Sequence, residues 1–111
     1  MDAIVEIDIM PGSPTNPINL ASRGVVAVAI LGSAEVDVTE VDVTTLVFGP
    51  AGAAPAHKVG GHPEDVNGDG FTDLVSHYRI QQTGIAPGDE RACVQGEIAG
   101  LIFSACDAIT T

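Results

Sequence analysis

The sequence predicts an all-β domain, a single β-sandwich of seven to eight mostly antiparallel strands that ends in a hairpin. Three observations indicate this fold class. Short alternating or fully apolar segments recur along the chain, Gly- and Pro-rich turns separate them, and no segment has the periodicity of an amphipathic helix of three turns. The 111 residues fit one domain, which we take as residues 1–111.

The N-terminal third supplies the first strands. The segment "DAIVEIDI" (2–9) alternates, with odd positions from 3 to 9 apolar, and this pattern is typical of a half-buried strand. The next residues, "MPGSPTNP" (10–17), predict a loop. A short strand "INL" (18–20) then precedes "VVAVAIL" (25–31), which is apolar on both faces and predicts a central strand.

The middle of the chain predicts an interrupted strand and a long loop. In "VDVTEVDVTT" (36–45) the strand phase slips at Thr39 and Glu40, which indicates a bulge or a turn. Asp37 or Asp42 could cap a short helical turn there. A short strand, "LVF", follows, and then a loop, "GPAGAAPAHKVGGHP" (49–63).

The C-terminal third predicts a strand and a hairpin. In "DLVSHYRI" (73–80), Leu74, Tyr78 and Ile80 share one face of the strand, which we expect to be the core face. After the turn segment "TGIAPGDE", the two arms "ACVQGEI" and "LIFSACDAI" form a hairpin whose turn is at Ala99 and Gly100.

The two cysteines lie on the arms of this hairpin. A two-residue turn at Ala99 and Gly100 places Cys93 opposite Cys106 as a non-hydrogen-bonded pair, with Cα atoms about 4.5 Å apart. A disulfide tolerates roughly 4.4–6.8 Å, so we predict a cross-strand disulfide, which would stabilise the fold by about 3 kcal/mol. The alternative is a pair of free buried thiols in a cytosolic protein. A disulfide implies an extracytoplasmic protein, either secreted or at the cell surface.

The charge balance restricts the partners. Fifteen acidic residues against four Lys and Arg give a formal net charge of −11, which makes nucleic acid and anionic membranes poor partners and cations good ones. No apolar run approaches the ~18 residues of a membrane span, so we expect no membrane insertion.

The segment "EDVNGDGFTDLV" (64–75) carries the clearest functional pattern. If Asp65 takes the first position of a calcium loop, Asn67, Asp69 and Asp73 carry side-chain oxygens at the later ligand positions. Gly70 then takes the sixth position and Phe71 the seventh, where the ligand is a backbone carbonyl. Alternate side chains of a tightly curled loop converge on one point, and Gly70 supplies the positive φ that the curl needs. Phe71 would lend its carbonyl oxygen while its ring enters the core.

This loop differs from an EF-hand. Position 12 is Ser76 and not Glu, "GGHPE" before the loop forbids a helix, and a strand follows it. We therefore predict one Ca²⁺ site in a β-sandwich, with at least one ligand from outside residues 65–73. Glu64, Asp8, Asp89 and a backbone carbonyl are the candidates. Two alternatives remain, a metal-free Asx-rich turn and Mg²⁺, which prefers fewer protein ligands.

Other combinations of reactive residues are less promising. His57, His62 and His77 could suggest zinc, but the first two fall in the predicted loop and the third on a strand, so surface or packing roles are favoured. Asp73, Ser76 and His77 are too close on one strand to form a catalytic triad. We expect no enzyme.

Several blocks resemble a β-rich module of large secreted bacterial proteins. In order they are "IDIMPGSPTNPINLASRGVVAVAILGS", "VDVTTLVFGP", "DVNGDGFTDLVSHY", "TGIAPGDERACVQGEI" and "CDAIT", which span nearly the whole chain. The loop alone is similar to those of dockerin modules, thrombospondin calcium repeats and FG-GAP blades. The resemblance implies secretion and a calcium loop at Asp65, Asn67, Asp69 and Asp73. It does not imply a known activity or a catalytic residue. Val43 departs from the pattern, which has Pro there.

The sequence thus predicts a non-catalytic, calcium-binding structural, accessory or adhesion-type module. Its partners would be the calcium ion, neighbouring domains of the same polypeptide, or a glycan. A carbohydrate-binding module is the alternative, although Tyr78, the only candidate stacking residue, is expected to face the core. A small hydrolase is less favoured.

Overall fold

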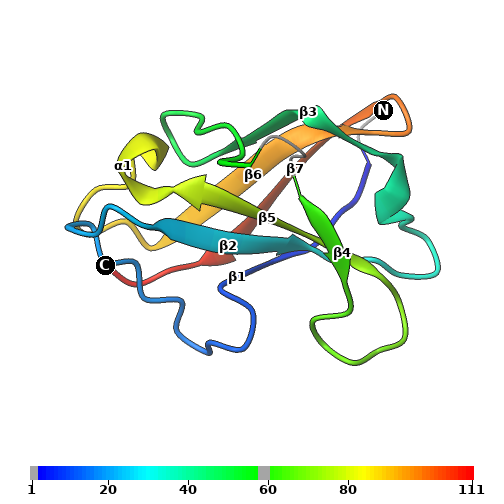
Figure 1. The fold of residues 1–111 in the computed structure, drawn as a ribbon, viewed down its shortest axis with the longest axis horizontal. Helices are drawn as coiled ribbons and strands as arrows, with labels where there is room; N and C mark the ends of the chain where they lie inside the picture. Colours follow the sequence, from blue (N-terminus) through cyan, green and yellow to red (C-terminus); the bar gives the residue numbers. More distant parts are fainter. Residues whose placement is uncertain (1–2, 58–60) are drawn as a thin grey trace.

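Two antiparallel sheets face each other in the structure, a computed structural model that describes residues 3–57 and 61–111 (Figure 1). One sheet has the order β1-β2-β5-β4 and the other β3-β6-β7. The described residues thus confirm the predicted all-β sandwich. Its strands are β1 (Ile7–Ile9), β2 (Val25–Ile30), β3 (Val41–Phe48), β4 (His62–Glu64), β5 (Asp73–Arg79), β6 (Arg91–Ile98) and β7 (Leu101–Ala108).

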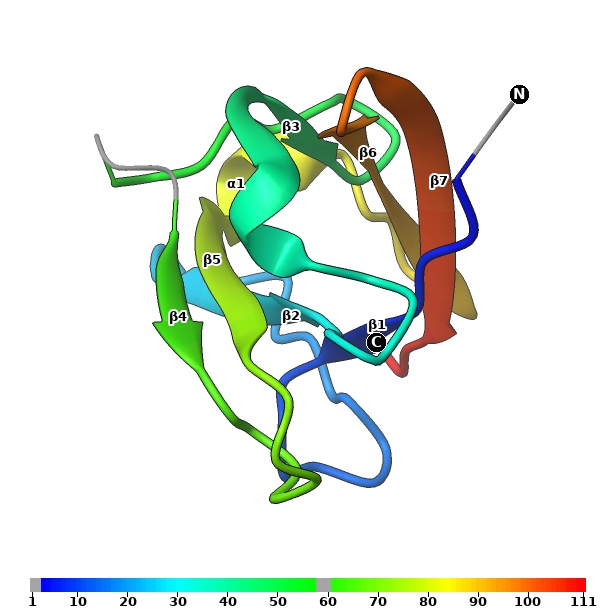
Figure 2. The same cartoon turned by 90° about the vertical axis from the view of Figure 1, so that its right-hand side faces the viewer.

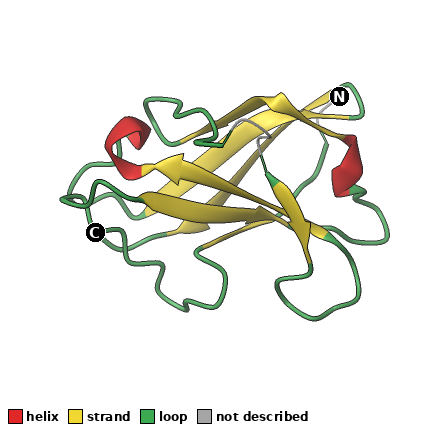
Figure 3. Cartoon of the chain, viewed as in Figure 1, coloured by secondary structure: helices red, strands yellow, loops and turns green. Residues whose placement is uncertain are grey.

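Two short helical turns lie near opposite ends of the sandwich (Figure 3). The 3₁₀ turn η1 (Val38–Glu40) begins where the strand phase was predicted to slip, and Asp37 caps it by accepting a hydrogen bond from the Thr39 N–H at 3.0 Å. The turn α1 (Ile80–Thr83) follows β5 and ends at Gly84, whose φ is 75°. In the described part of the chain, neither helix could cross a membrane.

The core fills the space between the two sheets, seen edge-on in Figure 2. The alternation of the strands turns Val28, Tyr78, Phe48, Val94 and Phe103 inward, and each is fully buried. The rings of Phe48 and Tyr78 have centroids 5.1 Å apart, so the two sheets touch there. The Tyr78 hydroxyl is hydrogen-bonded to the Ser76 hydroxyl at 2.9 Å, which satisfies two buried polar groups at once.

The N-terminal segment passes from one sheet to the other. The Ala3 N–H donates to the Ile102 carbonyl of β7, whereas Ile7–Ile9 pair with β2. The side chains still alternate as predicted, since Val5 and the isoleucines of β1 are buried and Ile4 is 91% exposed. The regular strand is shorter than the predicted residues 2–9 because the segment changes hydrogen-bonding partner halfway.

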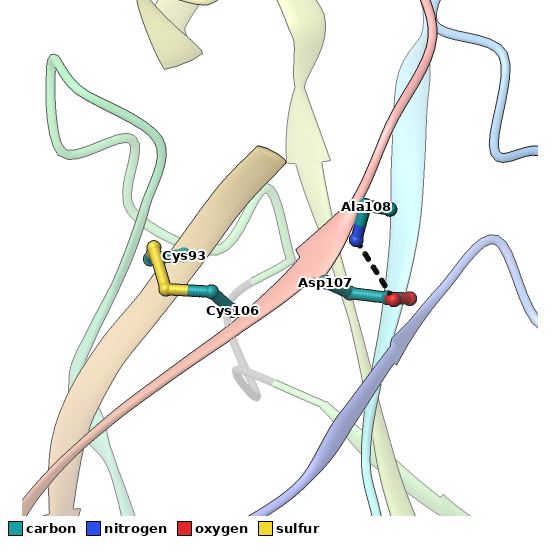
Figure 4. Close-up of a disulfide and its surroundings, with 4 residues drawn as sticks. All are labelled: Cys93, Cys106, Asp107 and Ala108. Atoms are coloured by element: carbon teal, nitrogen blue, oxygen red, sulfur yellow. Dashed lines mark hydrogen bonds between the residues drawn. A yellow bond between two sulfur atoms is a disulfide. The ribbon is translucent and has the colours of Figure 1, made fainter. Parts of the chain in front are cut away.

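The C-terminal hairpin has the predicted register. Ile98 pairs with Leu101, and the turn residues Ala99 and Gly100 have φ values of 50° and 79°, as a two-residue hairpin turn requires. Cys93 lies opposite Cys106 with Cα atoms 4.0 Å apart, and the two form a disulfide (Figure 4). The predicted pairing is confirmed.

Three predicted boundaries are wrong. Residues 18–20 form no strand, although the Ile18 N–H donates to Thr110 near an isolated bridge. The predicted loop 49–63 overlaps β4 at residues 62 and 63, and its residues 58–60 lie outside the described residues. Finally, "DLVSHYRI" remains extended only to Arg79, because Ile80 begins α1.

Removing both cysteines should lower stability without changing the fold. The two residues lie on the outer face of the hairpin, and the bond closes a short loop. The free energy of unfolding of the Cys93→Ala/Cys106→Ala protein should therefore be about 3 kcal/mol lower than that of the wild type. Urea denaturation measures this difference. A reductant should destabilise the wild type equally and leave the double variant unchanged; equal midpoints for oxidised and reduced wild type would contradict the prediction.

Candidate metal centre

The predicted calcium loop connects β4 to β5 at the lower right of Figure 1. Glu64 pairs with Asp73 across the antiparallel ladder, so Asp65 and Asp73 stand at the two ends of a closed loop. The predicted strand after the loop is confirmed. The strand before it was not predicted, because Pro63 cannot donate to a ladder and disfavours a strand assignment.

The loop curls around the carboxylate of Asp65. One Asp65 oxygen accepts from the Gly68 N–H at 2.9 Å and the other from the Gly70 N–H at 3.0 Å. Gly68 and Gly70 have φ values of 72° and 87°, a region that glycine adopts without strain. The predicted positive φ of Gly70 is confirmed, and the loop backbone is already wound around its first candidate ligand.

Two further side chains follow the same pattern at the exposed tip. Asn67 Oδ1 accepts from the Asp69 N–H at 3.4 Å, and Asp69 Oδ1 accepts from the Phe71 N–H at 2.9 Å. Each is an Asx-type contact between a side chain and the backbone two residues later. A carboxylate has about four acceptor positions, so the two bonds to Asp65 and the one bond to Asp69 leave both carboxylates free to bind a cation as well.

Asp73 holds the closing end of the loop and is fully buried. Its Oδ1 accepts from the Gly32 N–H at 2.8 Å, just beyond β2, and its Oδ2 accepts from the Val66 N–H at 2.9 Å. A Cβ on Gly32 would overlap the carbonyl of Thr72, so the loop fits against β2 only because residue 32 is glycine. This one carboxylate therefore joins the end of β2, the loop and the start of β5.

The predicted position of the Phe71 ring is wrong. The ring is 43% exposed and lies outside the core. Because the loop is wound around Asp65 and its second end is fixed by Asp73, the residue between them stays at the surface. This leaves the predicted use of the Phe71 carbonyl open, since that role depends on the backbone and not on the ring.

A cavity of about 500 Å³ lies beside the loop tip. Asn67 and Asp69 line it from the loop, and Glu6 and Glu35 line it from two other segments of the chain. Glu6 is brought there because its carbonyl accepts from the Leu31 N–H at 2.9 Å, which aligns the N-terminal segment with the end of β2. The remaining residues that line the cavity are Ile4, Leu31, Gly32, Ser33 and Val36.

Glu6 and Glu35 are the acidic residues that the sequence did not indicate. Their approach depends on the pairing of Ile7 with Ile30, a long-range contact with no local sequence signal. The sequence suggests three side chains as outside ligands, those of Glu64, Asp8 and Asp89. None of them lines this cavity.

The positions of Glu64, Asp8 and Asp89 explain why they do not line the cavity. Glu64 is exposed on β4, next to the loop. Asp8 pairs with Ala29 near the loop end of β2, but it lies close to Asp107 of β7: burial followed by the charge of Asp107 raises the pKa of Asp8. Asp89 follows α1, beyond the opposite end of β5, where it accepts from the Ala86 N–H.

The donors suit a hard cation, although they do not already converge on one point. Among residues 3–57 and 61–111, no three His, Cys, Asp or Glu side chains are arranged to hold a metal ion. The loop side chains bind backbone amides instead. The ligand types are nonetheless those of Ca²⁺, namely carboxylate and amide oxygens on a curled loop, and the cavity beside the tip leaves room for carboxylates to turn inward.

Comparison of the chain with protein-family models, with curated proteins and with solved structures found no match. The resemblance to modules of secreted bacterial proteins therefore stays a prediction, and function has to be inferred from the geometry.

The central role of Asp73 can be tested by its isosteric amide. Asp73→Asn places an NH₂ group against one of two backbone N–H donors, so the variant should lose about 1–3 kcal/mol of unfolding free energy in EGTA. Asp69→Asn is the matched control, because Asp69 is exposed and its loss should cost less than about 0.5 kcal/mol. Equal urea midpoints for the two variants would contradict the assigned role of Asp73.

Proposed function

We propose that this domain binds one structural Ca²⁺ at the loop between β4 and β5. The observation that carries the proposal is the cavity at the loop tip, where Asn67 and Asp69 share a lining with Glu6 and Glu35. With Asp65 inside the loop, these residues supply the several oxygen donors that Ca²⁺ requires. One of the two glutamates would take the place of the missing bidentate ligand at position 12.

Electrostatics favour a cation at this end of the sandwich. Asp65, Asp69 and Asp73 curl within one loop while Glu6 and Glu35 approach from outside, in a chain whose formal net charge is −11. A divalent cation would relieve the repulsion between these carboxylates. Ca²⁺ accepts many oxygens in an adaptable geometry, whereas Mg²⁺ demands a near-ideal octahedron and keeps several waters, so Ca²⁺ fits a flexible set of exposed ligands better.

The proposed role is that of an accessory or adhesion-type module in a secreted or cell-surface protein. The Cys93–Cys106 disulfide supports an oxidising compartment, in which such bonds persist. Extracellular calcium would then fix the loop and stabilise the domain. Neighbouring domains of the same polypeptide are the proposed partners.

Calcium-dependent glycan binding is the second candidate. Of the aromatic side chains, Tyr78, Phe48 and Phe103 are buried in the core, and Phe71 alone is exposed, at the calcium loop. One exposed ring on the calcium loop could stack against a sugar while calcium and carboxylates bind its hydroxyls. Retention on immobilised glycans in calcium, lost in Phe71→Ala, would favour this candidate over a purely structural role.

Calcium should stabilise the domain through residues 65–73. At a free calcium concentration 100 times Kd, the unfolding free energy should rise by about 2.7 kcal/mol relative to EGTA. Calorimetric titration should show binding to the wild type and its loss in Asp69→Ala. Asp42→Ala is the matched control, since Asp42 makes a similar contact with the Thr44 N–H on β3, away from the loop. Identical binding heats for wild type and Asp69→Ala would rule out this site.

The outside ligand should be found among the glutamates of the cavity. Glu6→Gln or Glu35→Gln should weaken calcium binding by about tenfold, equivalent to roughly 1.4 kcal/mol, because a carboxylate ligand is lost. Glu97→Gln, an exposed substitution on β6, controls for the lost charge. If both cavity variants bind calcium with wild-type affinity, the missing ligand lies elsewhere.

A further inference from the structure

The three histidines of the chain come together at one edge of the four-stranded sheet, although the sequence predicts two of them in a loop and the third on a strand. His77 is on β5, His62 is on β4, and His57 lies in the segment before β4. The ring centroid of His77 is 5.3 Å from that of His57 and 5.8 Å from that of His62. His77 therefore stands within reach of both other rings.

The backbone fixes this arrangement. His62 pairs with Val75, two residues before His77, so the two histidines are diagonal neighbours on one face of the sheet. The Ala56 N–H donates to the His77 carbonyl at 2.7 Å, which holds the segment bearing His57 beside β5. The cluster thus results from sheet register and a tertiary hydrogen bond.

The spacing suits a shared metal ion. Two imidazoles that bind one tetrahedral Zn²⁺ at 2.0–2.1 Å have ring centres about 5 Å apart. Both distances from His77 are close to this value. The three side chains do not yet meet at one point. His57 and His62 are exposed, however, and rotation about their side-chain bonds can turn their nitrogens toward His77.

The state of His77 also favours metal binding. Its Nδ1 is shielded from solvent and has no hydrogen-bond partner, which is unusual for a buried polar atom. Burial, followed by the proximity of His57 and of His62, lowers the pKa of His77, so the ring is neutral near pH 7. Neutral imidazole is the form that binds a metal.

We propose that His57, His62 and His77 form a second metal site, which takes a transition-metal ion of the Zn²⁺ class. Nitrogen ligands suit Zn²⁺, Ni²⁺ and Cu²⁺, whereas Ca²⁺ takes oxygen, so this site and the calcium loop select different ions. Water would complete the coordination. His77 also borders a groove of about 590 Å³ over β2.

The first test is titration of the calcium-saturated protein with ZnCl₂, followed in the imidazole ¹H–¹⁵N spectrum. Three single variants, His57→Gln, His62→Gln and His77→Gln, assign the three rings. At pH 7.5 all three imidazoles should shift together in a one-to-one titration. The shifts should vanish at pH 5.5, where protons compete for the ligands. Unchanged His77 resonances in excess zinc would overturn the proposal.

Calorimetry provides the second test, because a histidine variant that fails to fold would also fail to bind. Each variant is first checked for a cooperative thermal transition. Loss of a ligand should weaken zinc binding by at least the roughly 10- to 100-fold that loss of an outer-shell partner costs. Asp42→Ala, a charge removal on β3, should bind zinc as the wild type does. Wild-type affinity in folded His77→Gln would overturn the assignment.

Discussion

The buried carboxylate of Asp73 is the constraint on which the structure of the β4–β5 loop end of this sandwich depends. It accepts one hydrogen bond from Gly32, beyond β2, and one from Val66, in the loop, while Asp73 itself begins β5. A fully buried carboxyl group is tolerated only where hydrogen bonds satisfy it, and here both donors are backbone N–H groups. The position of the loop therefore follows from this residue, as does the position of the acidic cavity beside the loop.

The rest of the fold supplies a rigid frame for that loop. Phe48 and Tyr78 bring the two sheets into contact, and the disulfide between Cys93 and Cys106 joins β6 to β7 on the outer face of the second sheet. Asp107, which follows Cys106 on β7 (Figure 4), accepts from the Ile9 N–H of β1 at 3.0 Å and so links the two sheets through a side chain. The core is thus reinforced by covalent and polar links, while the tip of the loop is exposed to solvent.

Local features of the chain were predictable from sequence, and tertiary juxtapositions were not. The register of Cys93 and Cys106 follows from the two-residue turn at Ala99 and Gly100, and the conformation of Gly70 follows from its place in the loop. Strand β4 was missed because Pro63 disfavours strands, and with it the cluster of His62 with His77. Glu6 and Glu35 were missed because their approach to Asp69 depends on which strands pair. The loop of the candidate site could therefore be predicted from the sequence, whereas Glu6 and Glu35, which approach the loop from outside, could not.

The proposed calcium ion would bind the preformed loop held by Asp73. The most direct measurement is a ¹H–¹⁵N correlation spectrum recorded during calcium titration. The amides of Gly68, Gly70 and Phe71 already donate to the candidate ligands, and that of Gly32 donates to Asp73. These four resonances should shift together along one saturable curve, while those of the β6–β7 hairpin stay in place. If saturating calcium leaves the chemical shifts of all four amides unchanged, calcium does not bind at this loop.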